Sequence, residues 1–278
     1  MKIIFIADFF ANQVLGGGEL NNEELLEMLV IDGYDVIKIN SHNLTSAHIE
    51  KYKNDCFIVA NFVNIRKELI PKFYNKNYLI YEHDHKYMIS RNPGVYPGFK
   101  APPEHLVHID FYKNARAVLC QSHFHLEIVK MNTDLKNLVN LSGNLWSLKS
   151  LALMRELSTK EKINKFSIMD SPIEHKNTRE AIMYCVHTNK EYDLIKSSNY
   201  ETFLEKLSNN KTFVFFPKTP ETLSRVVVEA RMMGMSVVVN KMIGATREEW
   251  YRLKGEELID HMIEKRNTIK KIVLETMT

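Results

Sequence analysis

The chain has 278 residues, of which 45% are hydrophobic and 26% are charged, and its formal net charge is +3. This length allows one large domain or two of ordinary size, and the composition is typical of a soluble globular protein. So small a net charge gives no case for nucleic acid as the main partner.

Cysteine and hydropathy patterns indicate the compartment in which such a protein works. The three cysteines lie far apart and lack the spacing of a metal site, which suits a reduced, intracellular protein. No apolar run approaches the length of a membrane span. Residues 1–8 are apolar, but they end in an acid and contain no small-residue cleavage site, so we expect a first strand and not a signal peptide. We therefore expect a cytoplasmic protein, and peripheral contact with the inner face of a membrane stays open.

The first elements predict a βαβ unit with glycines at its first turn. A buried strand over residues 2–7 is followed by three glycines at 16–18, a helical pattern over 20–29 and a second strand over 34–39. Glycine lets backbone N–H groups approach a ligand closely at such a turn. The dinucleotide fingerprint G-x-G-x-x-G is not met, because Glu19 follows the glycines directly. The alternative interpretation is a flexible turn without a ligand.

Two further strands are predicted over residues 57–60 and 78–81, and the second runs into the sequence Glu-His-Asp-His. Residues just beyond the carboxyl end of a parallel strand are where α/β proteins bind ligands. His83 and His85 would share a face of an extended chain, so a metal site is conceivable. No third ligand with suitable spacing is evident, and we expect no metal.

The middle of the chain contains the predicted domain boundary. Four prolines between residues 92 and 103 mark a long loop near a site. A strand over residues 117–120 precedes a helix that begins at His123. The pattern breaks at Ser142-Gly143-Asn144, and a charged helical segment follows over residues 148–165. We place the boundary in this segment.

A second set of alternating strands and helices follows. Its predicted elements are a strand over 166–169, a helix over 178–186, a weak strand over 192–195, a helix over 200–207, a strand over 213–216, a helix that runs to Gly234 and a strand over 236–239. Strands alternating with helices twice over predict an α/β fold with two Rossmann-like, doubly wound domains that face a cleft, the second of them shortened. The predicted parts are an N-terminal domain (1–145), a linker helix (146–165), a C-terminal domain (166–246) and a C-terminal helix (247–278) that could pack back on the first domain.

The strand over 213–216 leads into the most informative motif. Glu221 would lie in the loop, and Glu229 would lie about two turns into the following helix. Ser224 is the expected N-cap, and a helix N-terminus there offers free N–H groups and a positive dipole end to a phosphate. A carboxylate on the next turn can accept hydrogen bonds from a ribose diol. The alternative is a surface loop and a half-buried helix with solvated acids.

Taken together, these features resemble the retaining glycosyltransferases of the GT-B fold, in particular glycosyltransferase family four (glycosyl transferases group 1). Glu221 and Glu229 look like that family's two glutamates eight positions apart. Gly16-Gly17, followed by Glu19, looks like its glycine turn after the first strand. His83-Asp84 looks like its histidine–aspartate pair at a strand end. The three matches occur in the right order, each at a strand end, and the resemblance covers most of the chain.

The resemblance implies a donor-binding role for several of these residues. Glu229 would hold the ribose hydroxyls of the donor. The backbone of Ser224 and Arg225 would face the diphosphate, and Gly16 and Gly17 would approach the donor phosphates or the acceptor. The first domain would bind the acceptor and the second domain the donor.

The resemblance also implies the candidate catalytic residues. His83 would contact the transferred sugar, and Glu221 would contact the donor sugar or its phosphate region. Lys176 lies where such enzymes carry a phosphate-binding lysine. Ser171 stands where they usually carry an arginine, five positions earlier, which weakens the diphosphate clamp unless Arg179 or Arg225 supplies the charge.

The implied activity is retaining, metal-independent hexosyl transfer from a nucleotide-diphosphate sugar, with a UDP-sugar as the favoured donor and no cofactor. The acceptor would be a glycan, a lipid-linked sugar or a small molecule. Retention in this family is thought to proceed by same-face attack, so Glu221 is not assigned as a nucleophile. The main alternative is a catalytically degenerate nucleotide-sugar-binding protein of the same fold, which Ser171 favours. A two-domain solute-binding protein and an epimerase of the same fold are the other hypotheses.

Overall fold

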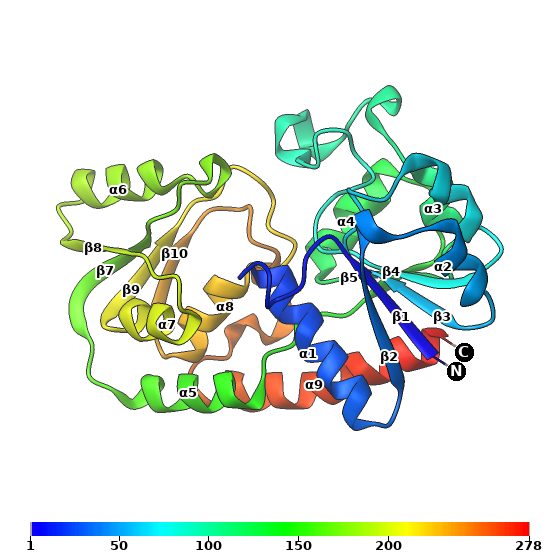
Figure 1. Ribbon diagram of the computed structural model, residues 1–278. Coiled ribbons are helices and arrows are strands. Elements are labelled where there is room, and N and C mark those ends of the chain that lie inside the picture. Colours follow the sequence, from blue (N-terminus) through cyan, green and yellow to red (C-terminus); the bar gives the residue numbers. More distant parts are fainter. Residues whose placement is uncertain (1, 278) are drawn as a thin grey trace. The chain divides into compact units, whose positions relative to one another are not determined.

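A computed structural model describes residues 2–277, and these residues form two compact units (Figure 1). Unit 1 comprises the described residues up to Leu145 and those from Arg266 onward, and unit 2 comprises Trp146–Lys265. Each unit is an α/β structure built on its own parallel sheet. The chain therefore contains two separate sheets, each with its own core.

Unit 1 contains a six-stranded parallel sheet in the order β2-β1-β3-β4-β5-β6. Its strands are β1 (Lys2–Ala7), β2 (Asp35–Asn40), β3 (Cys56–Val59), β4 (Asn77–Tyr81), β5 (Ala117–Cys120) and β6 (Leu138–Asn140). The central strands are continuous apolar runs because helices cover both faces of a parallel sheet. Along β1, Ile4 and Ile6 pack in one core layer while Ile3 and Phe5 pack in the other, as alternation along a strand requires.

The helices and turns of unit 1 connect its parallel strands. They are α1 (Gly17–Ile31), α2 (Ser46–Lys51), α3 (Ile109–Asn114) and α4 (His123–Asn132), with the 3-10 turns η1 (Ser41–Asn43), η2 (Lys67–Phe73), η3 (Pro93–Val95), η4 (Pro97–Phe99) and η5 (Pro103–His105). The predicted four-proline loop contains three of these turns. Asn132 on α4 ties the loop down, because its side chain donates to the Phe99 carbonyl and accepts from the Ala101 N–H, each at 2.8 Å.

Unit 2 contains a four-stranded parallel sheet in the order β10-β9-β7-β8. Its strands are β7 (Ile163–Met169), β8 (Tyr192–Ile195), β9 (Asn210–Phe215) and β10 (Ser236–Val239). The helices and 3-10 turns that begin in this unit are α5 (Leu148–Thr159), η6 (Glu174–Lys176), α6 (Thr178–His187), α7 (Tyr200–Ser208), α8 (Arg225–Met232), η7 (Gly244–Arg247), η8 (Glu249–Arg252) and α9 (Glu256–Met277). Helix α6 packs on one face of the sheet, while α5, α7 and α8 pack on the other. The smaller sheet confirms the prediction that the second domain is shortened.

Two segments differ from the sequence-based expectation. The helix expected over residues 148–165 ends at Thr159, and β7 starts at Ile163 because that residue already pairs with Asn210 of β9. The helix expected from 247 starts only at Glu256, because Gly255 before it adopts a φ of 58° and the preceding residues form 3-10 turns.

Helix α9 contributes apolar side chains to both cores. Leu258 and Met262 pack in the core of unit 2, whereas Ile269 and Val273 pack in the core of unit 1. Among the described residues, none of the helices combines the length and apolarity that a membrane span requires.

Candidate functional site

The loops at the carboxyl ends of unit 2's strands bring two of the predicted site residues together. Lys176 lies in the turn after β7 and Glu221 in the loop after β9, and the Lys176 Nζ atom is 2.8 Å from Glu221 Oε1. The loop after β10 fixes Glu221, whose N–H donates to the Met242 carbonyl at 2.8 Å and whose carbonyl accepts from the Gly244 N–H at 3.0 Å. The structure thus places an ammonium and a carboxylate, both partly exposed, where α/β folds bind ligands.

Ser224 stands at the N-cap of helix α8 beside this pair of loops, but its hydroxyl does not cap the helix. The Ser224 backbone has a φ of 76° and a ψ of 81°, in the left-handed region, whereas side-chain capping requires an extended backbone. Ser224 is therefore the N-cap residue, as predicted, but it makes no side-chain capping hydrogen bond. Ser224 is 5% exposed, and its Oγ atom has no hydrogen-bond partner among residues 2–277. A buried hydroxyl without a partner at an uncapped helix N-terminus suits an anion.

Glu229, the predicted ribose ligand, lies inside unit 2. It is 3% exposed, and its Oε1 atom accepts from the Trp146 indole N–H at 2.9 Å and from the Tyr200 hydroxyl at 2.7 Å. The Arg225 Nε atom is 3.6 Å from the same oxygen, and its guanidinium lies 4.5 Å from the centre of the Trp146 ring. Burial, and after it the Glu229 charge, raises the pKa of Tyr200 well above its usual value, so the phenol keeps its proton and donates it. Ribose binding by Glu229 stays a prediction.

Unit 1 places the glycine turn next to His83. Gly16 is the N-cap of α1 with an extended backbone, and Gly17 is the first residue of the helix. A Cβ atom on Gly16 would meet the Glu19 carboxylate, and one on Gly18 would lie 3.6 Å from the His83 ring. A side chain at position 16 would therefore displace the Glu19 carboxylate, and the extended backbone there does not itself require glycine.

The His83 ring is held at both nitrogens. Its Nε2 atom is 2.6 Å from Asn22 Oδ1, and its Nδ1 atom contacts the Gln121 side-chain NH₂. Because that NH₂ group can only donate, Nδ1 accepts and the proton lies on Nε2, from which it is donated to Asn22. Asn22 and Gln121 thus fix the orientation of the His83 ring.

An ionic cluster with a buried centre, Lys86 and Glu82, supports the segment that carries His83. The Lys86 ammonium lies 2.6 Å from Glu82 Oε1 and 2.7 Å from Asp84 Oδ1, while Tyr112 donates to Glu82 and Arg91 to Asp84. Burial raises the pKa of Glu82 to about 7 in spite of the Lys86 charge. Burial acts in the same direction on Asp84, but the Lys86 and Arg91 charges outweigh it and hold the pKa of Asp84 well below its usual range.

His85, the second histidine of the pair, has different contacts from His83. It is 1% exposed, and its Nδ1 atom is 3.0 Å from the Tyr87 hydroxyl. Its ring packs edge-on against His125, 5.0 Å between ring centres. Burial lowers the pKa of His85 to about 4, and it also lowers the pKa of His125 well below its usual value. Residues 2–277 contain no cluster of three histidine, cysteine or acidic side chains that could hold a metal ion.

These shifts predict a pH dependence of unit 1. The lowered pKa values of His85 and His125 contribute stability that is present above pH 6.5 and is lost as the pH falls towards 4. The raised pKa of Glu82 has the opposite sign, because its contribution is complete below pH 4.5 and is lost as the pH rises through about 7. Glu82→Gln removes the opposing contribution. We expect acidification from pH 7 to 5 to destabilise this variant by about 2 kcal/mol more than it destabilises the wild type.

Hydrogen exchange of peptides from β4 and β5 measures this difference in unit 1. Glu104→Gln is the matched control, since Glu104 is an exposed acid of the same unit and should leave the pH slope unchanged. A Glu82→Gln variant that loses less stability than the wild type on acidification would contradict the assignment.

No family model matches the sequence, and no curated protein matches it. Solved structures do match, with TM-scores of 0.59 for the catalytic domain of starch synthase IV from Arabidopsis thaliana bound to ADP and acarbose, and 0.55 for HepE from Anabaena in complex with UDP and glucose. An alpha-glucosyltransferase in complex with UDP and a 13-mer DNA has a TM-score of 0.51. The chain has the GT-B fold.

The GT-B likeness extends over whole chains. The starch synthase match has 10% identity and covers 99% of this chain and 93% of the other, and the HepE match has 13% identity and covers 97% and 92%. The alpha-glucosyltransferase match has 10% identity and covers 100% and 95%. At such identities the likeness establishes the GT-B fold and leaves the reaction to chemical argument. The predicted fold class, with two Rossmann-like parallel units, is confirmed.

Four residues that contact the candidate site residues of this GT-B chain do not stand out in its sequence. Asn22 and Gln121 hold the His83 ring, and Trp146 and Tyr200 hold Glu229. Only Gln121 carried a usable signal, because it directly follows the carboxyl end of a predicted strand, where ligand-binding residues gather. The expected arginine position holds Ser171, whose N–H is 3.2 Å from Thr178 Oγ1, so the loop after β7 is closed by hydroxyls and not by a guanidinium.

Proposed function

We propose that this protein is a glycosyltransferase that moves a hexose from a nucleotide-diphosphate sugar, with a UDP-sugar as the first choice, to a hydroxyl of an acceptor. The observation that carries the proposal is the uncapped N-terminus of α8, where the Ser224 hydroxyl is buried without a partner among residues 2–277. Lys176 from the neighbouring loop adds a positive charge. The GT-B fold, seen in structures that hold UDP or ADP, supports a nucleotide diphosphate as the anion.

The proposed reaction needs negative charge stabilised on the leaving diphosphate. The first-turn N–H groups of α8, the Ser224 hydroxyl and the Lys176 ammonium can do this without a metal ion. The acceptor oxygen forms a bond to the sugar's anomeric carbon, the bond from that carbon to the diphosphate oxygen breaks, and the acceptor proton passes to the leaving phosphate. Attack on the same face retains the configuration. Glu221 then positions Lys176 and accepts a hydrogen bond from a sugar hydroxyl, and it forms no covalent bond.

The acceptor in this proposal is a glycan, a lipid-linked sugar or a small molecule. A formal net charge of +3 does not favour nucleic acid. The alpha-glucosyltransferase with the same fold is nevertheless in complex with DNA, so duplex DNA belongs among the acceptors tested.

The transfer assay incubates the protein with UDP-, ADP- and GDP-hexoses and a panel of these acceptors, and it measures nucleotide release and the anomer formed. We expect release of one nucleotide that depends on an acceptor, and a product with the donor's anomeric configuration. Nucleotide release that is equal without an acceptor would indicate hydrolysis or epimerisation. An inverted product would contradict the retaining mechanism.

The second candidate is a protein that binds a nucleotide sugar without transferring the sugar. Two observations favour it: Glu229 is already engaged by Trp146 and Tyr200, and Ser171 stands where an arginine would strengthen the phosphate site. This candidate predicts donor binding and no turnover with any acceptor. It also predicts that Ser171→Arg strengthens nucleotide binding, because a guanidinium can bind a phosphate with two hydrogen bonds.

Ser224→Ala should have opposite effects on stability and on binding. Without a ligand, removing a buried hydroxyl that lacks a partner should leave stability unchanged or raise it by about 1 kcal/mol. Nucleotide-diphosphate affinity should fall by about 10-fold or more, because a hydrogen bond to a charged group is lost. Thermal unfolding and calorimetric titration measure the two effects. Ser236→Ala, at an exposed serine on β10, is the control. A less stable variant that binds nucleotide as tightly as the wild type would refute the assigned role of Ser224.

A further inference from the structure

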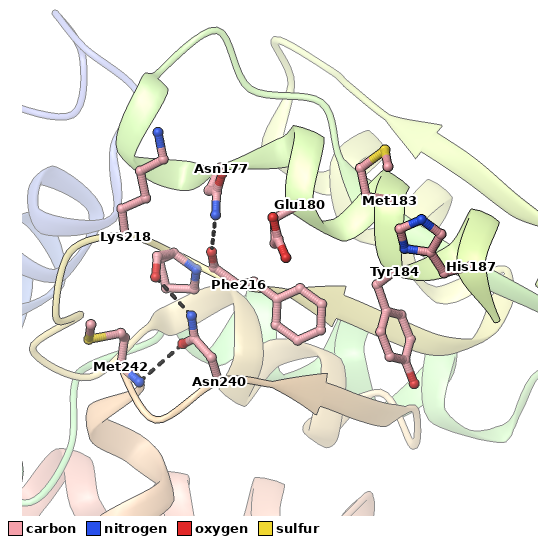
Figure 2. A pocket seen from close by; sticks show the side chains of 10 residues that line it. Asn177, Glu180, Met183, Tyr184, His187, Phe216, Lys218, Asn240 and Met242 are labelled. Carbon is pink, nitrogen blue, oxygen red and sulfur yellow. Dashed lines mark hydrogen bonds between the residues drawn. The ribbon is translucent and has the colours of Figure 1, made fainter.

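Unit 2 contains a groove of about 770 Å³ that none of the residues assigned above lines (Figure 2). Helix α6 forms one wall, and the residues that follow β9 and β10 form the other. The groove lies on the sheet face that carries Phe216 and Val238. Glu229 lies on a helix that packs on the opposite face, which carries Phe215 and Val239. The groove is therefore distinct from the buried hydrogen-bond network around Glu229.

Side-chain amides fix the rim of the groove. Asn177 donates to the Phe216 carbonyl at 2.9 Å, and Asn240 donates to the Pro217 carbonyl at 2.9 Å and accepts from the Met242 N–H at 3.0 Å (Figure 2). These bonds join the start of α6 to the ends of β9 and β10. The groove is thus pre-formed, and its volume is in the range of ligand pockets.

The α6 wall presents polar groups that have no partner in unit 2. Glu180, Tyr184 and His187 lie at positions i, i+4 and i+7, on one face of the helix over about 10 Å. Their side chains form no hydrogen bond or ion pair with any of residues 2–277. Figure 2 shows the Glu180 carboxylate directed into the groove towards Phe216. The Phe216 ring meets the Tyr184 ring edge-on, with 5.4 Å between ring centres.

The charge and polarity of the groove walls limit the class of ligand that can bind there. A phosphate-rich ligand would meet the Glu180 carboxylate, and Lys218, the lysine that lines the groove, is already 3.0 Å from Glu174. An acyl chain would bury the carboxylate without a partner, which is unfavourable. A pyranose ring has hydroxyls at its edge, which can donate to a carboxylate, and C–H groups on its faces, which pack on aromatic rings. We propose that this groove binds an oligosaccharide, at a site additional to the acceptor site that the resemblance implies for the first domain.

The groove adjoins the candidate donor site. Asn177 directly follows Lys176, and the Met242 carbonyl on the rim accepts from the N–H of Glu221. A saccharide chain lying along α6 would therefore end beside the Lys176–Glu221 pair. The choice of a saccharide as the hydroxyl-rich ligand rests on the proposed function. The existence of the groove does not depend on the proposed function.

The test is direct binding of oligosaccharides without any nucleotide. The full chain is applied to an array of neutral and acidic oligosaccharides, and the strongest hits are titrated by calorimetry. We expect at least one oligosaccharide to bind, and we expect Glu180→Gln to weaken its affinity by about 10- to 100-fold, because a charged hydrogen-bond acceptor is lost. Tyr184→Phe should weaken it by a smaller factor. Glu205→Gln, at an exposed acid on α7, is the matched control.

Two results would overturn the inference. One is no oligosaccharide binding at millimolar concentration, and the other is binding that both Glu180→Gln and Tyr184→Phe leave unchanged. Failure here is distinguishable from failure of the proposed function. Nucleotide binding with acceptor-dependent release, but no saccharide binding in the groove, would refute only the groove. Saccharide binding that depends on Glu180, without nucleotide binding, would refute only the glycosyltransferase.

Discussion

Lys176→Met should lower kcat/KM for sugar transfer by about 100- to 1000-fold, the effect of removing one charge-stabilising donor from a catalytic site. The lysine lies in the loop after β7, and its ammonium lies 2.8 Å from Glu221 in the loop that precedes α8. The substitution should change the free energy of unfolding by about 1 kcal/mol or less, because a partly exposed ion pair contributes no more than that. Steady-state kinetics at saturating acceptor, together with thermal unfolding, measures both expectations.

Lys211→Met provides the control for this loss of charge. Lys211 is an exposed lysine near the start of β9, at the other end of the strand from the Glu221 loop, and its replacement should leave kcat/KM unchanged. A Lys176→Met variant that transfers sugar at the wild-type rate would show that the diphosphate is stabilised elsewhere. A variant that loses activity only because it unfolds would be recognised by its lowered melting temperature.

Glu229→Ala should destabilise unit 2 by about 3–5 kcal/mol, because removing one partner of a buried charged network leaves the others uncompensated. The groups left behind are the Trp146 indole N–H, the Tyr200 hydroxyl and the Arg225 guanidinium. Both tryptophans of the chain lie in unit 2, so denaturant unfolding followed by tryptophan fluorescence reports on this unit. Glu161→Ala, at an exposed acid of the same unit, should change stability by less than about 0.5 kcal/mol.

Glu229→Gln separates a structural role from ribose binding. The amide oxygen can still accept from Trp146 and Tyr200, so this variant should be more stable than Glu229→Ala. If Glu229 also binds the ribose, nucleotide affinity of the folded variant should fall by about 10-fold or more. An affinity equal to that of the wild type would assign Glu229 to the fold alone and would contradict the predicted ribose contact.

The fold could be predicted from the sequence because its signals are local. Apolar strands such as residues 2–7 and 213–216 alternate with helical patterns, and parallel α/β folds follow from that alternation. The ends of the elements are harder to predict from the sequence. The end of α5 and the start of β7 depend on pairing between Ile163 and Asn210, which are far apart in the chain.

The candidate site could be predicted only in part. Strand ends identified the loops that carry Lys176 and Glu221, and the structure shows that these side chains meet. The hydrogen-bond partners of Glu229 could not be predicted from the sequence, because Trp146 lies 83 positions away and no spacing rule connects the two. The left-handed backbone conformation of Ser224 could not be predicted either, since it depends on the path of the loop in the folded protein and not on the identity of the residue.

Calorimetric titration of UDP, ADP, GDP and CMP into the wild-type protein, repeated on Ser224→Ala and Lys176→Met, tests the central claim most directly. A diphosphate nucleotide should bind selectively over the monophosphate CMP, raise the melting temperature in proportion to the logarithm of its concentration over its Kd, and bind about 10-fold or more weakly to both variants. If none of the four nucleotides binds at millimolar concentration, the start of α8 is not a diphosphate site and the proposed glycosyltransferase is wrong.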